Sequence, residues 1–250
     1  MSDYPVVNSY NGWDPLEEIV VGTAFHLDYS TDVSFRLFFA ENQLQEPYID
    51  RHGHSVRFEG DPTNRVRDEL IEDQEGFVAL LEGEGIRVRR PESLTEVKMI
   101  QTPDWQAAMG HALMSRDMFL VIGQEIIETA PMVRARYFES HLHHQVSLDQ
   151  LPEPMRKWDR IDYVPIQDPV ALDNEGLPLL ASQSIGMNVL SLDHDKVVVQ
   201  DIQVPLMKDL EKAGFTPIPC RWRHGRTLGG GFHCMTLDVR RRSVLEDYFS

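Results

Sequence analysis

The sequence predicts an α/β fold built as an array of repeated ββαβ units. The clearest unit spans residues 188–218, where two short apolar strands flank an Asp-His-Asp turn and a helix and a third strand follow. Related strand patterns open the chain and recur near residue 118. Recurrence of one supersecondary unit indicates a ring or an array. Because no boundary separates two parts, we expect a single domain over residues 1–250.

The first unit begins after a turn-rich opening. Ile19–Gly22 is a short apolar run and predicts a buried strand. Prolines and glycines interrupt residues 24–64, so we expect loops there. Apolar residues at helical spacing predict an amphipathic helix over Arg65–Glu84 that glycines close. Ile86–Arg89 then alternates as a strand.

The second unit reads as a hairpin. Met118–Ile122 predicts a buried strand, Gly123-Gln124 a turn and Glu125–Glu128 the partner strand. A crossover from Met132 onward should lead to a strand at Tyr163–Ile166.

The third unit is the most regular. It predicts strands at Asn188–Leu192 and Lys196–Gln200, a helix over Val204–Ala213 ended by a glycine, and a strand at Phe215–Ile218.

Composition limits the classes of partner. The formal net charge is −16, from 40 acidic and 24 basic residues, which argues against binding to nucleic acid or anionic membranes. It favours a small cationic substrate, or is simply a solvated acidic surface. The start of the chain lacks a signal-peptide pattern and no apolar run reaches membrane-spanning length, so we expect a cytoplasmic protein. Two cysteines are too few for a disulfide framework.

The stretch that organises the chain is Leu228–Arg241, in which three consecutive glycines precede Phe232, His233 and Cys234. Glycines let the backbone adopt positive φ or approach a ligand closely. A thiol delivered by such a turn is a candidate nucleophile, the alternative being a small buried residue. Cys220, beside a proline, is interpreted as a structural thiol.

This stretch resembles the C-terminal signature of the amidinotransferases related to L-arginine:glycine amidinotransferase, in the guanidino-modifying (pentein) superfamily. The likeness extends to Ser9–Glu18, Met114–Asp117, Met187–Leu190 and Val204–Lys208. It implies a propeller of ββαβ blades around a central site. It also implies that Cys234 attacks the guanidinium carbon of the substrate.

The resemblance also implies substrate-binding residues. Asp117 matches an aspartate that contacts the guanidinium, and a carboxylate suits that planar group. The alternative is that Asp117 only opens the following strand. Ser182 roughly matches a serine that hydrogen-bonds substrate, although Ala181 and Gly186 depart from the family pattern.

The family's long middle section is missing where this chain has the residues from about Ser140 to Val170. That section carries the family's catalytic histidine and aspartate, in His-Ile-Asp-Ala-type and Phe-Asp-Ala-Ala-Asp-type motifs. We therefore expect fewer blades than in the full family. Either another histidine replaces the missing base, or the protein does not catalyse the parent reaction. The candidate replacements are His224, ten residues before the thiol, and His144, in a cluster with His141 and His143.

Other charged groups have plainer interpretations. The histidine cluster would supply at most half a metal site, so no metal is expected, and no cofactor motif is present in the sequence. The basic run Arg221–Arg226 either binds a substrate carboxylate or is a solvated loop. Arg240–Arg242 is expected to pair with nearby acids.

Three functions follow. The first is transfer of an amidino group from arginine or a related guanidino donor to an amine, through a covalent intermediate on Cys234. The second is guanidino hydrolysis with the same nucleophile. The third is a non-catalytic binding or assembly protein that has lost the family's histidine and aspartate. Survival of the thiol segment and of Asp117 favours an enzyme with a small guanidino or amine substrate. A shortened ring also predicts a homo-oligomer, because each unit must shield its neighbour's apolar edge.

Overall fold

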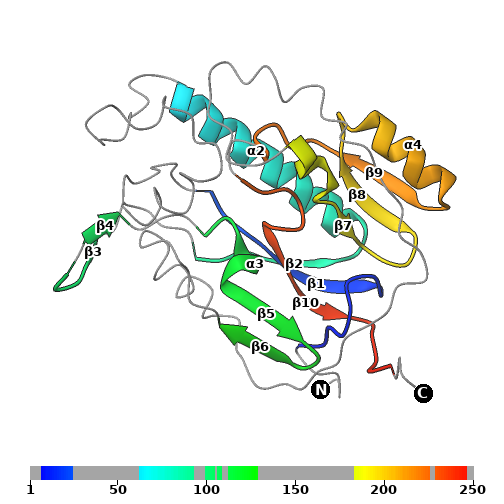
Figure 1. Ribbon diagram of the computed structural model, residues 1–250, viewed down its shortest axis with the longest axis horizontal. Helices are drawn as coiled ribbons and strands as arrows, with labels where there is room; N and C mark the ends of the chain where they lie inside the picture. Colours follow the sequence, from blue (N-terminus) through cyan, green and yellow to red (C-terminus); the bar gives the residue numbers. More distant parts are fainter. Residues whose placement is uncertain are drawn as a thin grey trace.

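The computed structural model describes much of the chain as mixed α/β structure (Figure 1). The described residues are 7–24, 62–92, 99–104, 106–108, 112–128, 183–225 and 229–246. Their strands form four small sheets. The predicted crossover from Met132 to Ile166 and nearly all of the expected loops over residues 24–64 lie outside these ranges.

The central sheet joins the two ends of the chain. Its middle strand is β1 (Leu16–Val21), which pairs antiparallel with β10 (Thr236–Arg241) and parallel with β2 (Arg87–Arg89). β1 is almost entirely buried, as the apolar run at Ile19–Gly22 predicted. The strand β10, which follows the thiol segment, is therefore fixed against β1.

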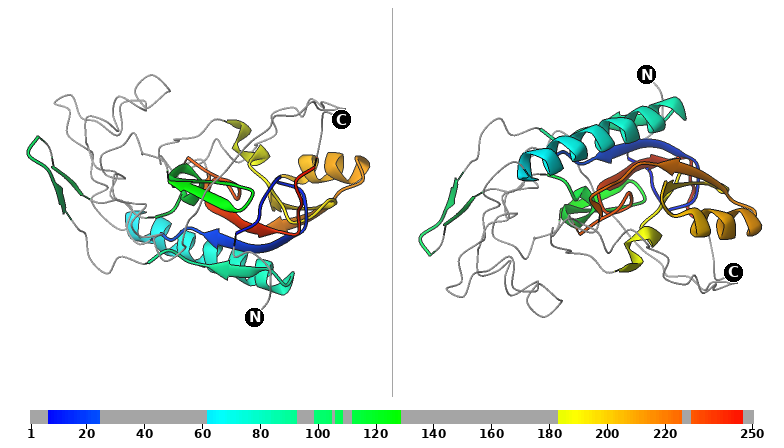
Figure 2. Two further views of the ribbon diagram at one scale, coloured as in Figure 1. Left: turned by 90° about the horizontal axis from the view of Figure 1, so that it is seen from below. Right: turned by 90° about the horizontal axis from the view of Figure 1, so that it is seen from above.

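Helix α2 (Pro62–Gly83) covers this sheet, and both views in Figure 2 show it running beside β1. Its inner side chains Leu70, Phe77 and Leu81 are fully buried. The chain leaves the helix through Gly85, whose φ of +82° suits glycine. The helix expected over Arg65–Glu84 is confirmed, with its start three residues earlier at a proline, a favourable first residue.

The second unit is a short helix followed by a hairpin. Helix α3 (Ser115–Met118) leads into β5 (Phe119–Ile122), which pairs antiparallel with β6 (Glu125–Glu128). The hairpin is confirmed, but the expectation that Met118 begins the strand was wrong. The four residues before Phe119 form one helical turn, and the chain becomes extended only at Phe119. A further hairpin, β3 (Met99–Gln101) with β4 (Gln106–Ala108), was not predicted.

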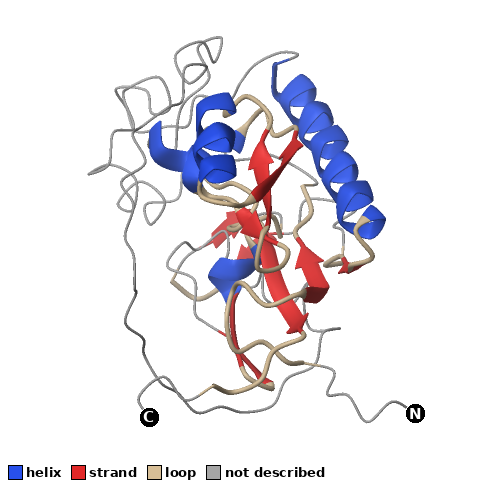
Figure 3. Cartoon of the chain, turned by 90° about the vertical axis from the view of Figure 1, so that its right-hand side faces the viewer, coloured by secondary structure: helices blue, strands red, loops and turns tan. Residues whose placement is uncertain are grey.

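The third unit has the predicted ββαβ order. The 3₁₀ helix η3 (Gln183–Met187) precedes β7, β8, α4 and β9, which span Leu190–Ser191, Lys196–Gln200, Val204–Lys212 and Thr216–Cys220. β8 pairs antiparallel with β7 and parallel with β9, so α4 is the crossover between parallel strands. Figure 3 shows α2 and α4 on different sides of the strands.

One apolar cluster connects these units. It unites residues of β1, α2 and the third unit with the thiol segment, including Phe77, Leu190, Trp222 and Phe232, and Cys234 packs against its edge. The thiol therefore lies where the first and third units meet. Among the described residues, no helix combines the length and the apolar character that a membrane span requires.

Candidate active site

The candidate nucleophile lies in a turn. Residues 232–235 form turns and β10 begins only at Thr236, so Cys234 lies in a turn and not in the strand. Hydrogen bonds within the segment explain the turn: Met235 N donates to Gly231 O at 3.2 Å, and Thr236 Oγ1 donates to Phe232 O at 2.8 Å. Cys234 is half-buried. We call residues 229–235 the thiol loop.

Each of the three glycines has a separate reason to be a glycine. Gly229 has φ of +80°. A Cβ atom on Gly230 would lie 2.5 Å from the Sδ atom of Met114, and one on Gly231 would lie 2.8 Å from the Cβ atom of Asn188. The predicted positive φ is confirmed at Gly229. The close approaches at Gly230 and Gly231 are to protein atoms, so the predicted approach to a ligand stays a prediction.

An aromatic anchor fixes the base of the thiol loop. Phe232 is buried, with its ring centroid 4.8 Å from that of Phe77 on α2 and 6.1 Å from that of Trp222. The indole Nε1 of Trp222 donates to Gly230 O at 3.0 Å. The thiol loop is therefore anchored to the apolar core through Phe232 and Gly230.

The Cys234 sulfur receives a hydrogen bond. Asn188, between η3 and β7, has its Nδ2 atom 3.0 Å from Sγ of Cys234. Its Oδ1 atom accepts from the backbone N of Cys234 at 3.0 Å and from that of Gly231 at 3.2 Å. One asparagine thus holds both the sulfur and the loop that carries it.

Helix α3 holds the loop from another side. Arg116 donates through its backbone N to Cys234 O at 3.4 Å and through Nε to His233 O at 2.9 Å. Partial burial and Arg116 both lower the pKa of His233. Asp117 follows Arg116 directly and has an exposed side chain. Asp117, the carboxylate predicted to bind the substrate, therefore lies on the helical turn that is hydrogen-bonded to the thiol loop.

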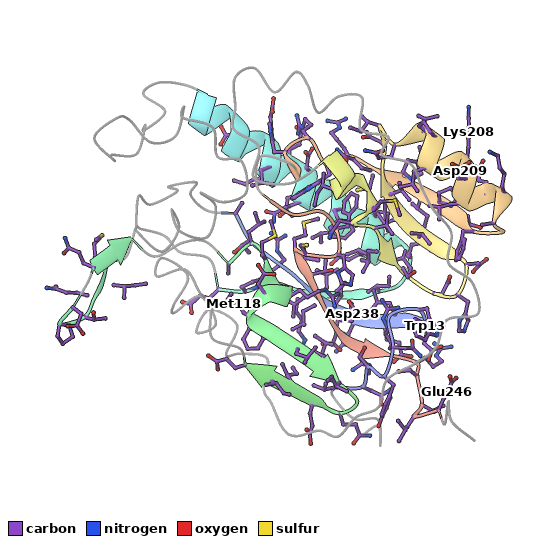
Figure 4. The ribbon with its side chains drawn as sticks, viewed as in Figure 1. Trp13, Met118, Lys208, Asp209, Asp238 and Glu246 are labelled. Atoms are coloured by element: carbon purple, nitrogen blue, oxygen red, sulfur yellow. The ribbon has the colours of Figure 1, made fainter. Side chains whose placement is uncertain are left out.

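Asp238 connects α3 to β10. Arg116 Nη2 lies 2.7 Å from its Oδ1, and Arg241 Nε lies 2.8 Å from its Oδ2. Burial alone would raise the pKa of Asp238, but Arg241 and Arg116 hold it below its ordinary value. Figure 4 labels this carboxylate on β10 and Met118 at the end of α3.

His224 and its neighbour face helix α2. The His224 ring is buried with Nε2 2.7 Å from Oε2 of Glu69, and Arg223 places Nη2 2.7 Å from Oδ1 of Asp73. The expectation that Arg221–Arg226 forms a solvated loop was therefore wrong for these two residues, which dock on the acidic face of α2. Whether His224 serves as a base stays a prediction.

Other predicted site residues fall elsewhere. His144 and Ser182 lie outside the described ranges. Cys220 is buried, and desolvation with nearby Asp201 and Asp73 raises its pKa to about 12, which supports its interpretation as a structural thiol.

The terminal arginines pair with acids as expected: Arg240 with Glu17 and Glu18, Arg241 with Asp238, and Arg242 with Glu17. Among the described residues, no three His, Cys, Asp or Glu side chains are grouped as metal ligands.

Sequence reasoning missed two residues that touch the thiol loop, Asn188 and Arg116. Both lie in segments that carried the family resemblance, next to residues that were singled out. The available signal was position within those segments. Their side-chain chemistry gave no indication by itself, because an asparagine or an arginine in a loop is an ordinary surface residue.

Comparison with known proteins supports the resemblance. No family model matches the chain. The chain is 25% identical to a mitochondrial glycine amidinotransferase of Xenopus laevis, over 97% of this chain and 85% of that protein. It is 27% identical to inosamine-phosphate amidinotransferase 1 of Streptomyces glaucescens (97% and 99%) and 26% identical to an L-arginine:L-lysine amidinotransferase of Pseudomonas savastanoi (97% and 96%).

The alignments also bear on chain length. The match to the Xenopus laevis protein spans 366 aligned positions, whereas this chain has 250 residues, so at least 116 positions are gaps in this chain. Because 97% of the chain is aligned, the gaps are internal. This agrees with the predicted internal shortening.

Solved structures show the same fold. The inosamine-phosphate amidinotransferase of Streptomyces griseus matches with a TM-score of 0.74 and 25% identity, over 98% of this chain and 99% of that one. An amidinotransferase from Microseira wollei matches in fold with a TM-score of 0.67 and 23% identity, over 97% and 99%. The resemblance to the amidinotransferases and their pentein-type α/β fold is thus confirmed. The number of blades stays a prediction.

Proposed function

We propose that this chain, whose relatives in sequence and fold are amidinotransferases, transfers an amidino group from arginine or a related guanidino donor to an amine. Cys234 is the proposed nucleophile. The observation that carries the proposal is the thiol loop itself, in which the half-buried Cys234 follows a glycine turn and its sulfur accepts a hydrogen bond from Asn188. A thiol kept only for packing needs no such donor at its sulfur.

The reaction has two displacement steps. In the first, the sulfur bonds to the guanidinium carbon, the carbon–nitrogen bond to the donor breaks, and the departing amine takes the proton that the thiol has lost. In the second, the acceptor amine attacks the amidino carbon and gives up a proton. The sulfur–carbon bond then breaks and its electron pair returns to sulfur. One amidino group has moved from the donor to the acceptor, and the thiol is regenerated.

Asp117 is the proposed partner of the guanidinium. A carboxylate can receive two parallel N–H bonds from this planar cation. The position of Asp117 supports this role. Its neighbour Arg116 donates to the carbonyl groups of His233 and Cys234, so the α3 turn is held beside the thiol loop. The net charge of −16 also favours approach of a cationic donor. Ser182, which precedes η3, is a further proposed hydrogen-bond partner of the substrate.

Both proton transfers need a base. We propose His224 or His144 for this role in place of the missing family histidine. His224 already has Nε2 bonded to Glu69, so it would have to exchange protons through its other ring nitrogen. Such a carboxylate–imidazole pair orients the ring.

Intact-mass measurement after incubation with L-arginine tests the proposal. We expect a mass increase of one amidino group, present in a Cys220→Ala variant, absent in Cys234→Ala, and removed by adding an amine. A guanidino hydrolase would lose the adduct in water alone and release urea. A binding protein would form no adduct, and that result would overturn the proposal.

We also propose that copies of the chain associate. Leu120 and Ile127 form a cross-strand pair on the β5–β6 hairpin and are 48% and 42% exposed. Burial of this pair between copies would follow from the shortened ring. Sedimentation velocity at micromolar concentration should show a dimer or larger species, and a stable monomer would refute this expectation.

A further inference from the structure

The amide of Asn188 has a defined orientation. Its Oδ1 atom faces two backbone N–H groups, those of Cys234 and Gly231, at 3.0 and 3.2 Å. Turning the amide over would place its NH₂ group against these two donors and would lose both bonds. The NH₂ group must therefore face the sulfur, 3.0 Å away.

This orientation fixes the role of the sulfur. An amide NH₂ group only donates hydrogen bonds. The Cys234 sulfur is consequently an acceptor at Asn188, and a negatively charged sulfur accepts more strongly than a neutral one. The contact is strongest while the sulfur carries charge, and it weakens once the sulfur is bonded to carbon.

Asn188 has little freedom to leave this position. Its backbone N donates to Ile185 O at 2.8 Å, and the Cα of Gly231 lies so close that an added Cβ would be 2.8 Å from both the Cβ and the backbone O of Asn188. The preceding 3₁₀ turn is packed in the same way, because Gly186 lies directly against the buried side chain of Gln203. The donor is therefore already placed before any substrate binds.

We propose that Asn188 is a catalytic residue that holds the Cys234 sulfur as a thiolate for attack and stabilises it again when it departs. This inference rests on the proposed amidino transfer. Asn188 gives up no proton: its N–H donates to the sulfur as the sulfur–carbon bond forms in the first step and as that bond breaks in the second. It thus takes over part of the stabilisation that a neighbouring imidazolium would give.

The variant Asn188→Asp separates this role from support of the loop. An aspartate retains an oxygen for the N–H groups of Cys234 and Gly231 but puts an oxygen where the NH₂ donor was. Asn11→Asp is the matched control, because Asn11 also accepts from two backbone N–H groups (Trp13 and Asp14) and donates through Nδ2 to a carboxylate, that of Asp14. It makes the same substitution away from the thiol.

The readout is the rate at which iodoacetamide alkylates Cys234, followed by mass spectrometry over a range of pH without any guanidino compound. We expect Asn188→Asp to slow alkylation at neutral pH on the order of 10-fold or more and to move the pH profile to higher pH. Asn11→Asp should leave rate and profile unchanged. Thermal unfolding checks that each variant is folded, and Gly231→Ala, which displaces Asn188, should also slow alkylation.

The outcomes are distinct. An Asn188→Asp variant that is folded and is alkylated like wild type overturns the inference, whether or not the protein forms an adduct with arginine. If the pH profile moves as expected but wild type forms no adduct with arginine, the assignment of Asn188 to the sulfur stands and the proposed transfer fails.

Discussion

The Nη2 atom of Arg116 lies 2.7 Å from Oδ1 of Asp238, and this pair joins helix α3 to strand β10. The same arginine donates to the carbonyl of His233, next to the candidate nucleophile. The other carboxylate oxygen of Asp238 accepts a hydrogen bond from Arg241, which is only 1% exposed. Arg241 also donates to Asp14 O and Ser191 O. One buried carboxylate therefore ties the α3 turn, β10 and β7 together around the thiol loop.

Replacing this carboxylate should be costly. We expect Asp238→Asn to lower the free energy of unfolding at pH 7 by about 3–5 kcal/mol, because it leaves the buried Arg241 without a counter-charge. Asp209→Asn, on the exposed face of α4 (Figure 4), removes a surface pair with Lys212 and should cost less than about 1 kcal/mol. Urea unfolding of both variants provides the comparison.

The pH dependence of the same variant provides a second check. The folded protein holds the pKa of Asp238 below its ordinary value of about 3.8, so the unfolded chain binds a proton first as pH falls. The stabilisation is present above that ordinary value and is lost as pH falls through the folded one. The stability difference between wild type and Asp238→Asn should shrink below about pH 4. A difference that is constant down to pH 3 would contradict this assignment.

The glycines of the thiol loop give a steric prediction. A Cβ on Gly230 would lie 2.5 Å from Sδ of Met114 and 2.9 Å from Cβ of Cys234. We expect Gly230→Ala to destabilise by about 1–3 kcal/mol and to slow alkylation of the thiol. Gly76→Ala, with nothing within 4 Å and a position inside α2, should instead stabilise by about 0.5–1 kcal/mol. Equal effects of the two substitutions on unfolding would refute the packing argument.

The elements that the sequence predicted well are those whose signals are local. The helix ended near Gly85, the hairpin at Gly123 and the whole ββαβ unit from Leu190 to Cys220 combine apolar periodicity with a glycine at the turn, and all three are present. The short strands β3 and β4 have only three residues each, which is too few for a periodic pattern.

The site was harder to predict because its contacts are distant in sequence. Asn188 reaches the sulfur across 46 positions, and Arg116 reaches the carbonyl of His233 across 117. The motif located Cys234, but the hydrogen bonds that form the turn around it could not be predicted from the motif. The sequence offered a substrate carboxylate or solvent as the surroundings of Arg223, and it did not indicate docking on α2 because the partners there lie some 150 residues earlier.

Docking of Arg223 on α2 should contribute strongly to stability. Its guanidinium bonds Asp73, whose side chain is 0% exposed, so Arg223→Ala should cost about 3 kcal/mol or more in unfolding free energy. Arg221→Ala is the matched control, since Arg221 and its partner Glu72 are both exposed and 3.6 Å apart, and it should cost less than about 1 kcal/mol. If both variants unfold at the same urea concentration, the Arg223–Asp73 pair is not a structural anchor.

Cys220 predicts how the protein responds to alkali. Its thiol has a pKa of about 12 in the folded protein against an ordinary 9.0, mainly because burial opposes the charged form. The unfolded chain therefore releases this proton first, and rising pH favours unfolding by about 1.4 kcal/mol per pH unit between these values. A Cys220→Ala variant should lose less stability than wild type between pH 9 and 10.5, by about 2 kcal/mol. Urea unfolding across that range measures how the unfolding free energy of wild type and of Cys220→Ala changes with pH. The same pH dependence in both would show that the thiol of Cys220 has the same pKa in the folded and the unfolded chain.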